Sequence, residues 1–342
     1  MSKRSFEKRR VGTTGLEVTT LGLGGASLAG IFSAVPEDQA RATVRHALES
    51  GITYVDTAPQ YGLGRSEHLV GEVVRGAHPR PVISTKVGRL LRPVSPERQD
   101  KGNWIDPLPF DQHYDYSYDG VMRSFEDSLQ RLGLERVDIL YVHDIGVATH
   151  GVEGNRPLWK QLEGGGYRAL RELRDGGVIK AIGLGVNEWE VLMDAFALGD
   201  WDVFLLAGRY TLLEQTALDP FLSTCLDRRA SVVIGGPFNS GILVGGDTFN
   251  YAKASEDVVR KVRAIEAVCR EFGVALPAAA LQFPLTHPAV CNVLPGPRSP
   301  EELDGILAWW DAPIPHELWT TLAERGLLAE GTPLPPASST IS

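Results

Sequence analysis

Four residues whose chemistry suits a proton relay lie at or just beyond the ends of successive predicted strands. Asp56, Lys86 and His143 each end a short apolar run, and Tyr61 follows Asp56 in the next loop. A phenol, with an ordinary pKa of about 10, is a poor proton donor or acceptor at neutral pH. A nearby ammonium lowers that pKa, a carboxylate keeps the ammonium charged, and an imidazole can hydrogen-bond a reacting oxygen. The set predicts the interconversion of a carbonyl and an alcohol.

Each of these residues also has a structural alternative. An aspartate at a strand end often caps the following loop. A lone lysine or histidine at a strand end, or a tyrosine in a loop, is commonly a hydrogen-bonded or packed structural residue. The catalytic interpretation is favoured because all four fall at the same end of successive units.

These side chains meet only if their strands belong to one parallel sheet. Short apolar runs alternate with amphipathic segments along the chain and predict eight strand–helix units. The predicted strands are residues 18–24, 52–56, 81–86, 137–143, 179–184, 202–207, 231–235 and 290–294. The predicted helices are residues 36–50, 65–75, 118–132, 166–175, 188–197, 219–229, 255–272 and 300–310.

Mostly apolar, β-branched strands without clean alternation are typical of a parallel sheet buried on both faces. Eight units favour an α/β fold of the (β/α)8 TIM-barrel class, and the count alone leaves an open doubly wound sheet as the alternative. In a barrel the carboxyl ends of all strands surround one mouth, where active sites are built.

Several segments lie outside these units. Residues 11–18 predict a short N-terminal hairpin, and two long loops, 87–116 and 144–165, follow the third and fourth strands. We expect a single barrel domain over residues 1–330. The Pro- and Ser-rich residues 331–342 predict a disordered tail.

The composition excludes several classes of protein. The chain has 342 residues, 23% of them charged, and a net charge of −9, which argues against nucleic acid or an anionic membrane as a partner. Its three cysteines, Cys225, Cys269 and Cys291, lack metal-ligand spacing and predict reduced thiols and no metal site. No signal peptide or membrane-spanning run is recognised. We expect a cytoplasmic protein acting on a small molecule, and the sequence does not determine its oligomeric state.

Five motifs resemble the aldo-keto reductase family. They are DTAPQYG at 56–62, STK at 84–86, DILYVH at 138–143, IGLGVN at 182–187 and LPGPRSPEEL at 294–303. The likeness extends from about residue 10 to residue 328. It implies hydride exchange with a nicotinamide cofactor, with Tyr61 as general acid/base, Lys86 and Asp56 tuning it, and His143 orienting the carbonyl oxygen.

The same resemblance implies a cofactor site beside the catalytic group. Asn187 would hold the nicotinamide carboxamide, the loop 236–241 would hold the pyrophosphate, and 294–303 the adenosine end. The cofactor-binding candidates are Gly25, Asp56, Asn187, Pro237, Phe238, Ser240, Gly296, Arg298 and Glu302. Two positions depart from the family: Gly235 replaces a common aromatic residue that stacks on nicotinamide, and Ala207 lies near a common glutamine.

The adenosine-end segment favours NAD over NADP. A 2′-phosphate usually meets several cationic or hydroxyl groups. Here Arg298 stands beside Glu301 and Glu302, whose carboxylates would repel a phosphate. Arg298 could instead serve the pyrophosphate or be a solvated surface residue.

Residues 86–91 (KVGRLL) and 206–213 (LAGRYTLL) resemble the family's aldose 1-dehydrogenase and pyridoxal 4-dehydrogenase branch. This implies NAD-linked oxidation of a cyclic hemiacetal, an aldose such as L-fucose or pyridoxal, to a lactone. Candidate substrate-binding residues are Trp104, His113, Tyr114 and Arg209. The alternatives are an NADPH-dependent reductase of aldehydes or ketones and a non-catalytic, nucleotide-binding regulatory barrel. The presence of all four relay residues counts against the latter.

Overall fold

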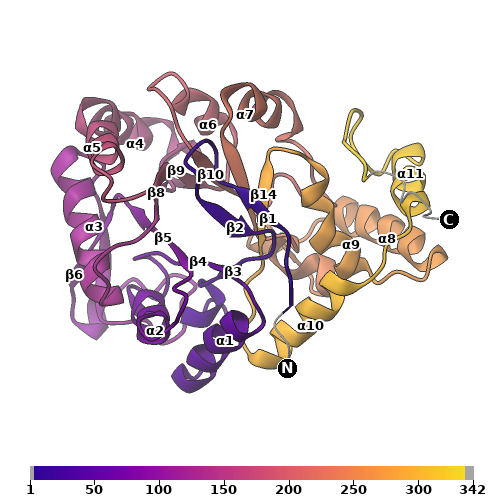
Figure 1. Ribbon diagram of the computed structural model, residues 1–342, viewed down its shortest axis with the longest axis horizontal. Coiled ribbons are helices and arrows are strands. Elements are labelled where there is room, and N and C mark those ends of the chain that lie inside the picture. The colour runs from indigo at the N-terminus through magenta and orange to yellow at the C-terminus, as the bar shows by residue number, and fades with distance from the viewer. Residues whose placement is uncertain (1–3, 336–342) are drawn as a thin grey trace.

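Eight parallel strands stand at the centre of the molecule and follow one another around the sheet in chain order (Figure 1). The computed structural model describes residues 4–335. The barrel strands are β3 (Leu23–Gly24), β4 (Tyr54–Asp56), β5 (Val82–Val87), β8 (Ile139–His143), β9 (Ala181–Val186), β10 (Val203–Ala207), β11 (Ser231–Gly235) and β14 (Val290–Leu294). The backbone N–H groups of Gly22 and Gly24 donate to the carbonyls of Val293 and Pro295 at 2.9 Å and so join the first strand to the last. The predicted barrel is confirmed, and the open-sheet alternative is wrong.

Helices surround the barrel and connect its strands (Figure 1). Those that correspond to predicted helices are α1 (Glu37–Glu49), α2 (Arg65–Val74), α3 (Tyr118–Leu132), α5 (Tyr167–Asp175), α6 (Glu190–Ala195), α7 (Ser223–Arg228), α8 (Glu256–Glu271) and α10 (Pro300–Asp311). The predicted bounds of α3 are correct because both of its ends carry strong signals. The Ser117 side chain accepts a hydrogen bond from the N–H of Gly120, and Gly133 ends the helix with a φ of 62°.

Two predicted elements are wrong in extent or type. The first predicted strand, 18–24, divides: its start belongs to a hairpin, and the barrel strand β3 is only Leu23–Gly24, preceded by a single bridge between Leu21 and Val293. The predicted long loop over 144–165 is mostly α4 (Val147–Gln161), followed by a helical turn, Leu162–Gly166, that leads into α5. No residue of α4 is buried, so its sequence lacks the apolar stripe from which an amphipathic helix is predicted.

Besides α4, the prediction missed two further α-helices of the described part of the chain. Most residues of α9 (Leu276–Gln282) are buried, so this short helix has no polar face to give a helical period. The other, α11 (His316–Glu324), follows the last barrel helix and packs against α8 at the edge of the molecule (Figure 1).

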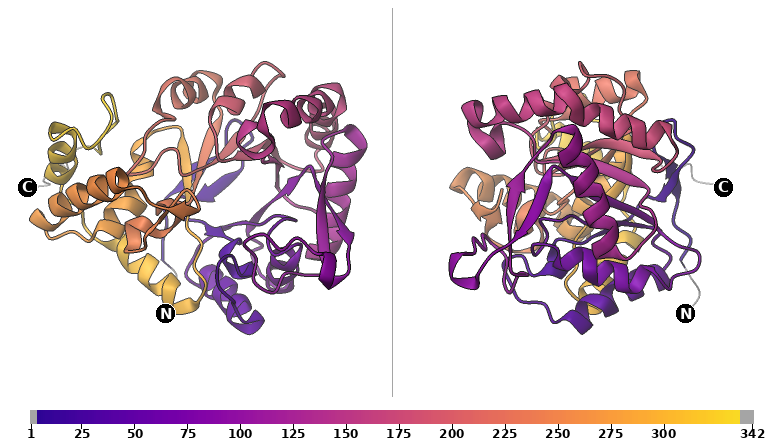
Figure 2. Two further views of the ribbon diagram at one scale, coloured as in Figure 1. Left: turned by 180° about the vertical axis from the view of Figure 1, so that it is seen from behind. Right: turned by 90° about the vertical axis from the view of Figure 1, so that its left-hand side faces the viewer.

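Hairpins lie at opposite ends of the barrel (Figure 2). The predicted N-terminal hairpin is confirmed as the antiparallel pair β1 (Lys8–Arg10) and β2 (Glu17–Thr19). Its Val11 and Val18 are buried against the barrel interior and close the amino-terminal end.

The predicted long connection after the third barrel strand contains a second hairpin, formed by β6 (Arg89–Pro93) and β7 (Phe110–Tyr114), at the mouth. A short third hairpin, β12 (Thr248–Phe249) and β13 (Ala252–Lys253), follows β11.

Side-chain alternation along the strands directs the predicted catalytic residues into the barrel. On β4, Tyr54 packs inside and the next residue packs outside, so Asp56 points inward. On β8, Tyr141 packs inside, and two positions later His143 also points inward. The parallel pairing of β5 with both strands places Lys86 beside Tyr141. Three separate segments thus deliver ionisable side chains to one end of the barrel.

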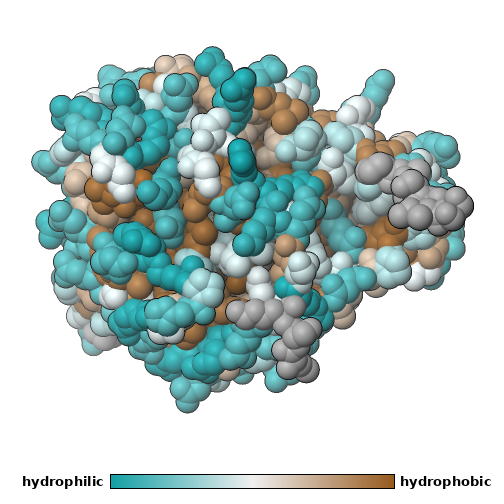
Figure 3. Space-filling view, viewed as in Figure 1, coloured by the Kyte–Doolittle hydropathy of each residue, from teal (hydrophilic) through white to brown (hydrophobic). Residues whose placement is uncertain are grey.

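Across residues 4–335, no helix combines the length and the apolar character needed to cross a membrane. The face in Figure 3 is mostly hydrophilic, with smaller hydrophobic areas between polar side chains. Near the end of the described chain, Leu334 packs against the core, and residues 336–342 lie outside the described part. The single domain over 1–330 and the disordered tail over 331–342 stay predictions.

Candidate active site

A buried ion pair lies at the centre of the mouth. The Nζ atom of Lys86 donates to Oδ2 of Asp56 at 2.6 Å and to the carbonyl of Thr57 at 3.0 Å. The side chains of Lys86 and Asp56 are only 1% and 2% exposed, so neither charge is solvated by bulk water. Burial lowers the pKa of Lys86, and the carboxylate opposes that shift. The two charges therefore depend on each other.

A chain of buried hydroxyls supports Asp56 from inside the barrel. Ser84 Oγ donates to Oδ1 of Asp56 at 2.7 Å. Because this bond uses the Ser84 proton, the Tyr54 hydroxyl donates to Ser84 at 2.9 Å, and the Tyr141 hydroxyl donates to Tyr54 at 3.1 Å. The carboxylate oxygen that does not face Lys86 is thus fixed by interior residues.

Tyr61 lies against the ion pair and against His143. The Lys86 Nζ atom is 4.6 Å from the centroid of the Tyr61 ring. The Tyr61 ring meets the imidazole of His143 edge-on with centroids 5.9 Å apart, and the ring of Trp104 lies 5.9 Å away on another side. The predicted catalytic set is therefore brought together, with Trp104 beside it.

The protonation of Tyr61 differs from expectation. Desolvation raises the pKa of Tyr61 well above its ordinary value, the charges of Asp56 and Asp144 raise it further, and Arg89 opposes them. The predicted net lowering is not found, because desolvation dominates and the charge of Asp56, the partner of Lys86, adds to the rise. In this structure the phenol is the resting form.

His143 is buried and uncharged. Desolvation lowers its pKa well below the ordinary value, and the charges of Arg89 and Lys86 lower it further. Its carbonyl accepts a hydrogen bond from the Tyr116 hydroxyl at 2.7 Å. The Nδ1 atom is buried and has no hydrogen-bond partner within the described residues 4–335. A neutral imidazole can donate one hydrogen bond without adding positive charge to the site.

Two charged residues near His143 were not predicted as part of the site. Arg89, at the start of β6, is 2% exposed and forms an ion pair with Asp144, which directly follows β8. The carboxylate of Asp144 lies 3.6 Å from Nε2 of His143. The available signal was the direct succession of His143 and Asp144 and the Gly88-Arg89 pair after Lys86.

The predicted substrate residues do not form one group. Trp104 lies beside Tyr61, whereas Tyr114 lies beside Arg89, whose guanidinium carbon is 5.0 Å from the Tyr114 ring centroid. His113 is exposed on β7, next in sequence to Tyr114 and so on the other face of that hairpin. The side chain of Arg209 donates to the carbonyl of Asn187 at 2.8 Å and pairs with Glu214 at 3.1 Å. Arg209 therefore helps to hold the cofactor candidate Asn187.

Asn187 is held from two sides. Its nitrogen donates to Oδ1 of Asp144 at 3.3 Å, and its oxygen accepts from the Tyr251 hydroxyl at 3.3 Å. The backbone N–H of Tyr251 donates in turn to Ser240 Oγ at 3.0 Å. Tyr251, from the β12–β13 hairpin, was not predicted, because its hairpin falls in a segment without an apolar pattern. It places an aromatic ring next to Asn187, although the position at Gly235 lacks one.

The remaining cofactor candidates lie farther along the mouth. Pro237 is buried, and Phe238 packs edge-on against Trp309 with centroids 5.8 Å apart. A Cβ at Gly25 would lie 2.6 Å from Ser66 Oγ, and one at Gly296 would lie 2.7 Å from Ser27 Oγ. Packing within the chain is therefore sufficient to require glycine at both positions, and their contact with a cofactor stays a prediction.

The mouth has features that fit a nicotinamide. A Cβ at Gly236 would have no neighbour within 4 Å, and one at Gly208 would first meet Nδ2 of Asn239 at 3.6 Å. That Asn239 nitrogen donates to the carbonyl of Gly208 at 3.2 Å, while the side-chain oxygen is buried without a partner in the described part of the chain. Open space beside β10 and β11 and an unpaired acceptor suit a flat ring that carries a carboxamide.

Arg298 at the predicted adenosine end is already neutralised. Its guanidinium pairs with Glu302 at 2.7 Å and donates to Ser33 Oγ at 3.1 Å. The backbone N–H of Arg298 also donates to Glu302 at 2.8 Å. The predicted proximity of the arginine and the glutamate is confirmed.

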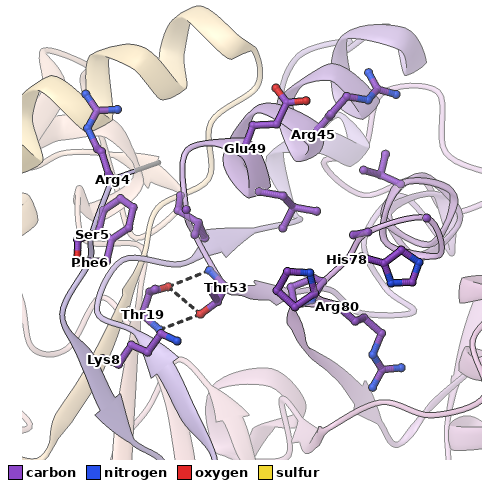
Figure 4. A pocket seen from close by; sticks show the side chains of 18 of the residues that line it. Arg4, Ser5, Phe6, Lys8, Thr19, Arg45, Glu49, Thr53, His78 and Arg80 are labelled. Atoms are coloured by element: carbon purple, nitrogen blue, oxygen red, sulfur yellow. Dashed lines mark hydrogen bonds between the residues drawn. The ribbon is translucent and has the colours of Figure 1, made fainter. Parts of the chain in front are cut away.

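A hollow of about 630 Å³ lies at the opposite, amino-terminal end of the barrel (Figure 4). Its walls carry Arg4, Phe6, Arg45, Glu49 and His78, and none of the predicted catalytic residues lines it. Within residues 4–335, no cluster of three His, Cys, Asp or Glu side chains could hold a metal ion.

Comparison with known proteins shows the family of the chain. A sequence profile of the aldo/keto reductase family matches residues 20–325. The chain is 47% identical over 343 residues to pyridoxal 4-dehydrogenase of Microbacterium luteolum, covering 96% of this chain and 100% of that protein. It is 36% identical to D-threo-aldose 1-dehydrogenase of Pseudomonas sp., covering 92% and 96% of the two chains.

Among solved structures, an aldo-keto reductase from Bacillus halodurans has the same fold, with a TM-score of 0.70 over 95% of this chain and 97% of that one, at 22% identity. The family profile and the two sequence relatives extend over nearly all of the barrel. The chain belongs to the aldo/keto reductase family and is an NAD(P)-dependent oxidoreductase.

Proposed function

We propose that this enzyme uses NAD to oxidise a cyclic hemiacetal to a lactone, with pyridoxal as the first candidate substrate and an aldose such as L-fucose as the second. The observation that carries the proposal is the packing of Tyr61 against Lys86 and His143 at the mouth. The two relatives named above as a pyridoxal and an aldose dehydrogenase support this substrate class. Pyridoxal ranks first because the similarity to its dehydrogenase is greater.

The proposed step moves one proton and one hydride. Tyr61, as the phenolate, takes the proton of the hemiacetal hydroxyl, and His143 donates a hydrogen bond to the same oxygen. NAD, when bound, would supply the acceptor for the hydride of the hemiacetal carbon. The carbon–oxygen bond becomes a carbonyl, so the product is a lactone and the proton is finally released to solvent. Lys86 and Asp56 provide the fixed charges around the phenol.

We propose that Asn187, Asn239 and Ser240 hold the nicotinamide end of the cofactor. Asn187 and Asn239 offer amide groups at the mouth, and Ser240 anchors the hairpin that carries Tyr251. The Tyr251 ring is the aromatic group available where the family's common residue is replaced by Gly235. Pro237, Phe238, Gly25 and Gly296 remain candidates for the rest of the cofactor.

The raised pKa of Tyr61 predicts different pH dependences for the two directions. Near neutral pH the phenol is protonated, so oxidation, which needs the phenolate, should speed up as pH rises, by up to about tenfold per unit. Reduction uses the protonated phenol and should not speed up over the same range. Initial rates in both directions between about pH 6 and about pH 10 measure this. Equal pH profiles in the two directions would contradict the assignment of Tyr61.

We also propose that NAD is preferred to NADP because Glu302 neutralises Arg298 and adds negative charge where a 2′-phosphate would lie. Glu302→Gln should free the guanidinium and lower the KM for NADP about fivefold, with little change for NAD. Glu301→Gln is the comparison variant: it also removes one carboxylate, but Glu301 forms no ion pair with Arg298 within residues 4–335, so the KM for NADP should fall less than in Glu302→Gln. Steady-state kinetics with each cofactor measure the effect, and an unchanged preference in Glu302→Gln would refute this explanation.

A panel of initial rates tests the function itself. The purified enzyme is given pyridoxal, L-fucose, a D-threo-aldose or a simple aldehyde, with NAD(H) or NADP(H), and the reduced cofactor is followed by its absorbance. We expect NAD-dependent oxidation of pyridoxal or an aldose to exceed every reductive rate in kcat/KM. Reduction of aldehydes by NADPH alone would favour the reductase alternative. Cofactor binding without any turnover would favour a regulatory barrel.

The cytoplasmic location and the absence of nucleic-acid or membrane partners stay predictions. They agree with three buried free thiols, at Cys225, Cys269 and Cys291.

A further inference from the structure

We propose that Asp144, held in place by Arg89, is a positioning residue that sets the hydrogen-bonding state of His143 and the orientation of Asn187. The inference rests on the proposed function, because it concerns how the same site orients the reacting oxygen and the nicotinamide. Asp144 lies between the two residues: its carboxylate is 3.6 Å from Nε2 of His143 and 3.3 Å from Nδ2 of Asn187. One carboxylate thus contacts both halves of the predicted reaction centre.

The backbone at Asp144 shows that its placement is specific. Its φ is 46°, in the left-handed region that residues with a side chain seldom adopt. The conformation is held by a hydrogen bond from the Asp144 N–H to the carbonyl of Gly185 at 2.9 Å. This turn at the end of β8 directs the carboxylate back toward the mouth. Strain of this kind persists where the surroundings impose it, and it is frequent at functional sites.

Arg89 fixes the carboxylate from the other side. Its guanidinium pairs with Asp144 and also donates to Gln112 at 2.5 Å and to the Tyr114 hydroxyl at 3.1 Å. Gly88 lets the chain pass close to Tyr116 just before Arg89. It has a φ of 95°, and a Cβ there would lie 2.2 Å from the Tyr116 ring. A guanidinium that is 2% exposed needs a counterion, and Asp144 provides it.

The effect on His143 follows from its neutral state. A neutral imidazole carries one N–H, and the acceptor it faces determines which nitrogen carries it. The carboxylate of Asp144 faces Nε2, whereas Nδ1 has no partner within residues 4–335. The hydrogen is therefore favoured on Nε2. Because the carboxylate lies 3.6 Å away, beyond the length of a hydrogen bond, this N–H remains available to donate to the reacting oxygen.

Asp144 also fixes the orientation of the side-chain amide of Asn187. The carboxylate of Asp144 can only accept, so the amide nitrogen faces it, and the amide oxygen faces the Tyr251 hydroxyl. Without Asp144 the amide could rotate by half a turn. The cofactor would then bind to an amide group that is no longer held in one orientation.

The test compares five variants with the wild-type enzyme. Asp144→Asn keeps the shape and removes the charge, so kcat should fall about 10- to 100-fold and the KM for NAD should rise about 3- to 10-fold. The primary deuterium isotope effect on kcat should increase, because hydride transfer becomes slower than product release. A structural defect alone would not produce that increase.

Because Asp144→Asn leaves a buried guanidinium unpaired, it could unfold the chain, and the double variant Arg89→Met with Asp144→Asn removes that charge as well. We expect the double variant to melt near the wild-type temperature and to keep the turnover defect. Arg89→Lys keeps a cation and should retain more activity than Arg89→Met. Equal losses in these two single variants would overturn the role of Arg89.

Asp202→Asn is the matched control. Asp202 forms a similar, partly buried pair with Arg174 at 3.1 Å, at the start of β10 and away from the mouth. We expect its kcat and isotope effect to stay at the wild-type values. The inference fails if the folded double variant turns over within about twofold of wild type, or if Asp202→Asn shows the same defect. If the wild-type enzyme itself does not oxidise a hemiacetal, the proposed function fails instead, so the two failures are distinguishable.

Discussion

Replacing Tyr61 with phenylalanine should reduce the oxidation of pyridoxal or an aldose by about 10²- to 10⁴-fold while leaving NAD binding unchanged. The substitution removes one oxygen and keeps the ring, so the contacts with Trp104 and His143 at 5.9 Å persist. The proton of the substrate hydroxyl then has no phenolate to accept it. Steady-state turnover and a titration with NADH, read by protein fluorescence, measure the two quantities separately.

Tyr118→Phe is the control for Tyr61→Phe. The Tyr118 hydroxyl donates to Glu172 at 2.6 Å on the exposed surface of α3 and lies outside the mouth. We expect full activity in this variant. If Tyr61→Phe also keeps full activity, the tyrosine is not the acid/base, and the mechanism proposed for the mouth is wrong.

Replacing Lys86 with methionine should damage both turnover and stability. It leaves the carboxylate of Asp56 buried at 2% exposure without its ammonium partner, which should lower the free energy of unfolding by about 3–5 kcal/mol. Turnover should fall by about 10³-fold, because the fixed positive charge beside Tyr61 is lost. Urea unfolding and initial rates measure the two effects.

A double variant separates the two roles of the ion pair. Lys86→Met with Asp56→Asn removes both charges, so stability should largely return while turnover stays low. Glu37→Gln, in an exposed pair with Arg41, should change the free energy of unfolding by less than about 1 kcal/mol and serves as the control. Recovery of turnover in the double variant would show that the charges are structural only.

The barrel was predictable because its signals are local and repeated. The bounds of α3 and of the strands β11 and β14 agree with the predicted ones, since capping residues and apolar runs mark them in the sequence. The failures occurred where such signals are absent. The helix α4 buries no residue, and the apolar residues of 18–24 are shared between a hairpin and the barrel.

The catalytic group was predictable for a different reason. Asp56 and His143 end their strands, Lys86 is the last residue but one of β5, and the parallel register of a barrel brings strand ends together. Arg89 and Asp144 were not placed in the site, because they are 55 residues apart and only the fold pairs them. The pKa of Tyr61 was also mispredicted, because a sequence shows which charges are near but not how much water they lose.

Hydride transfer from a labelled substrate shows whether the enzyme oxidises a cyclic hemiacetal to a lactone with NAD. Pyridoxal, in its cyclic hemiacetal form, is labelled with deuterium at the hemiacetal carbon and incubated with the enzyme and NAD, and both products are analysed by mass spectrometry. We expect one deuterium in the reduced cofactor and a lactone without deuterium. Recovery of unlabelled reduced cofactor, or of a reduced alcohol in place of the lactone, would contradict this expectation.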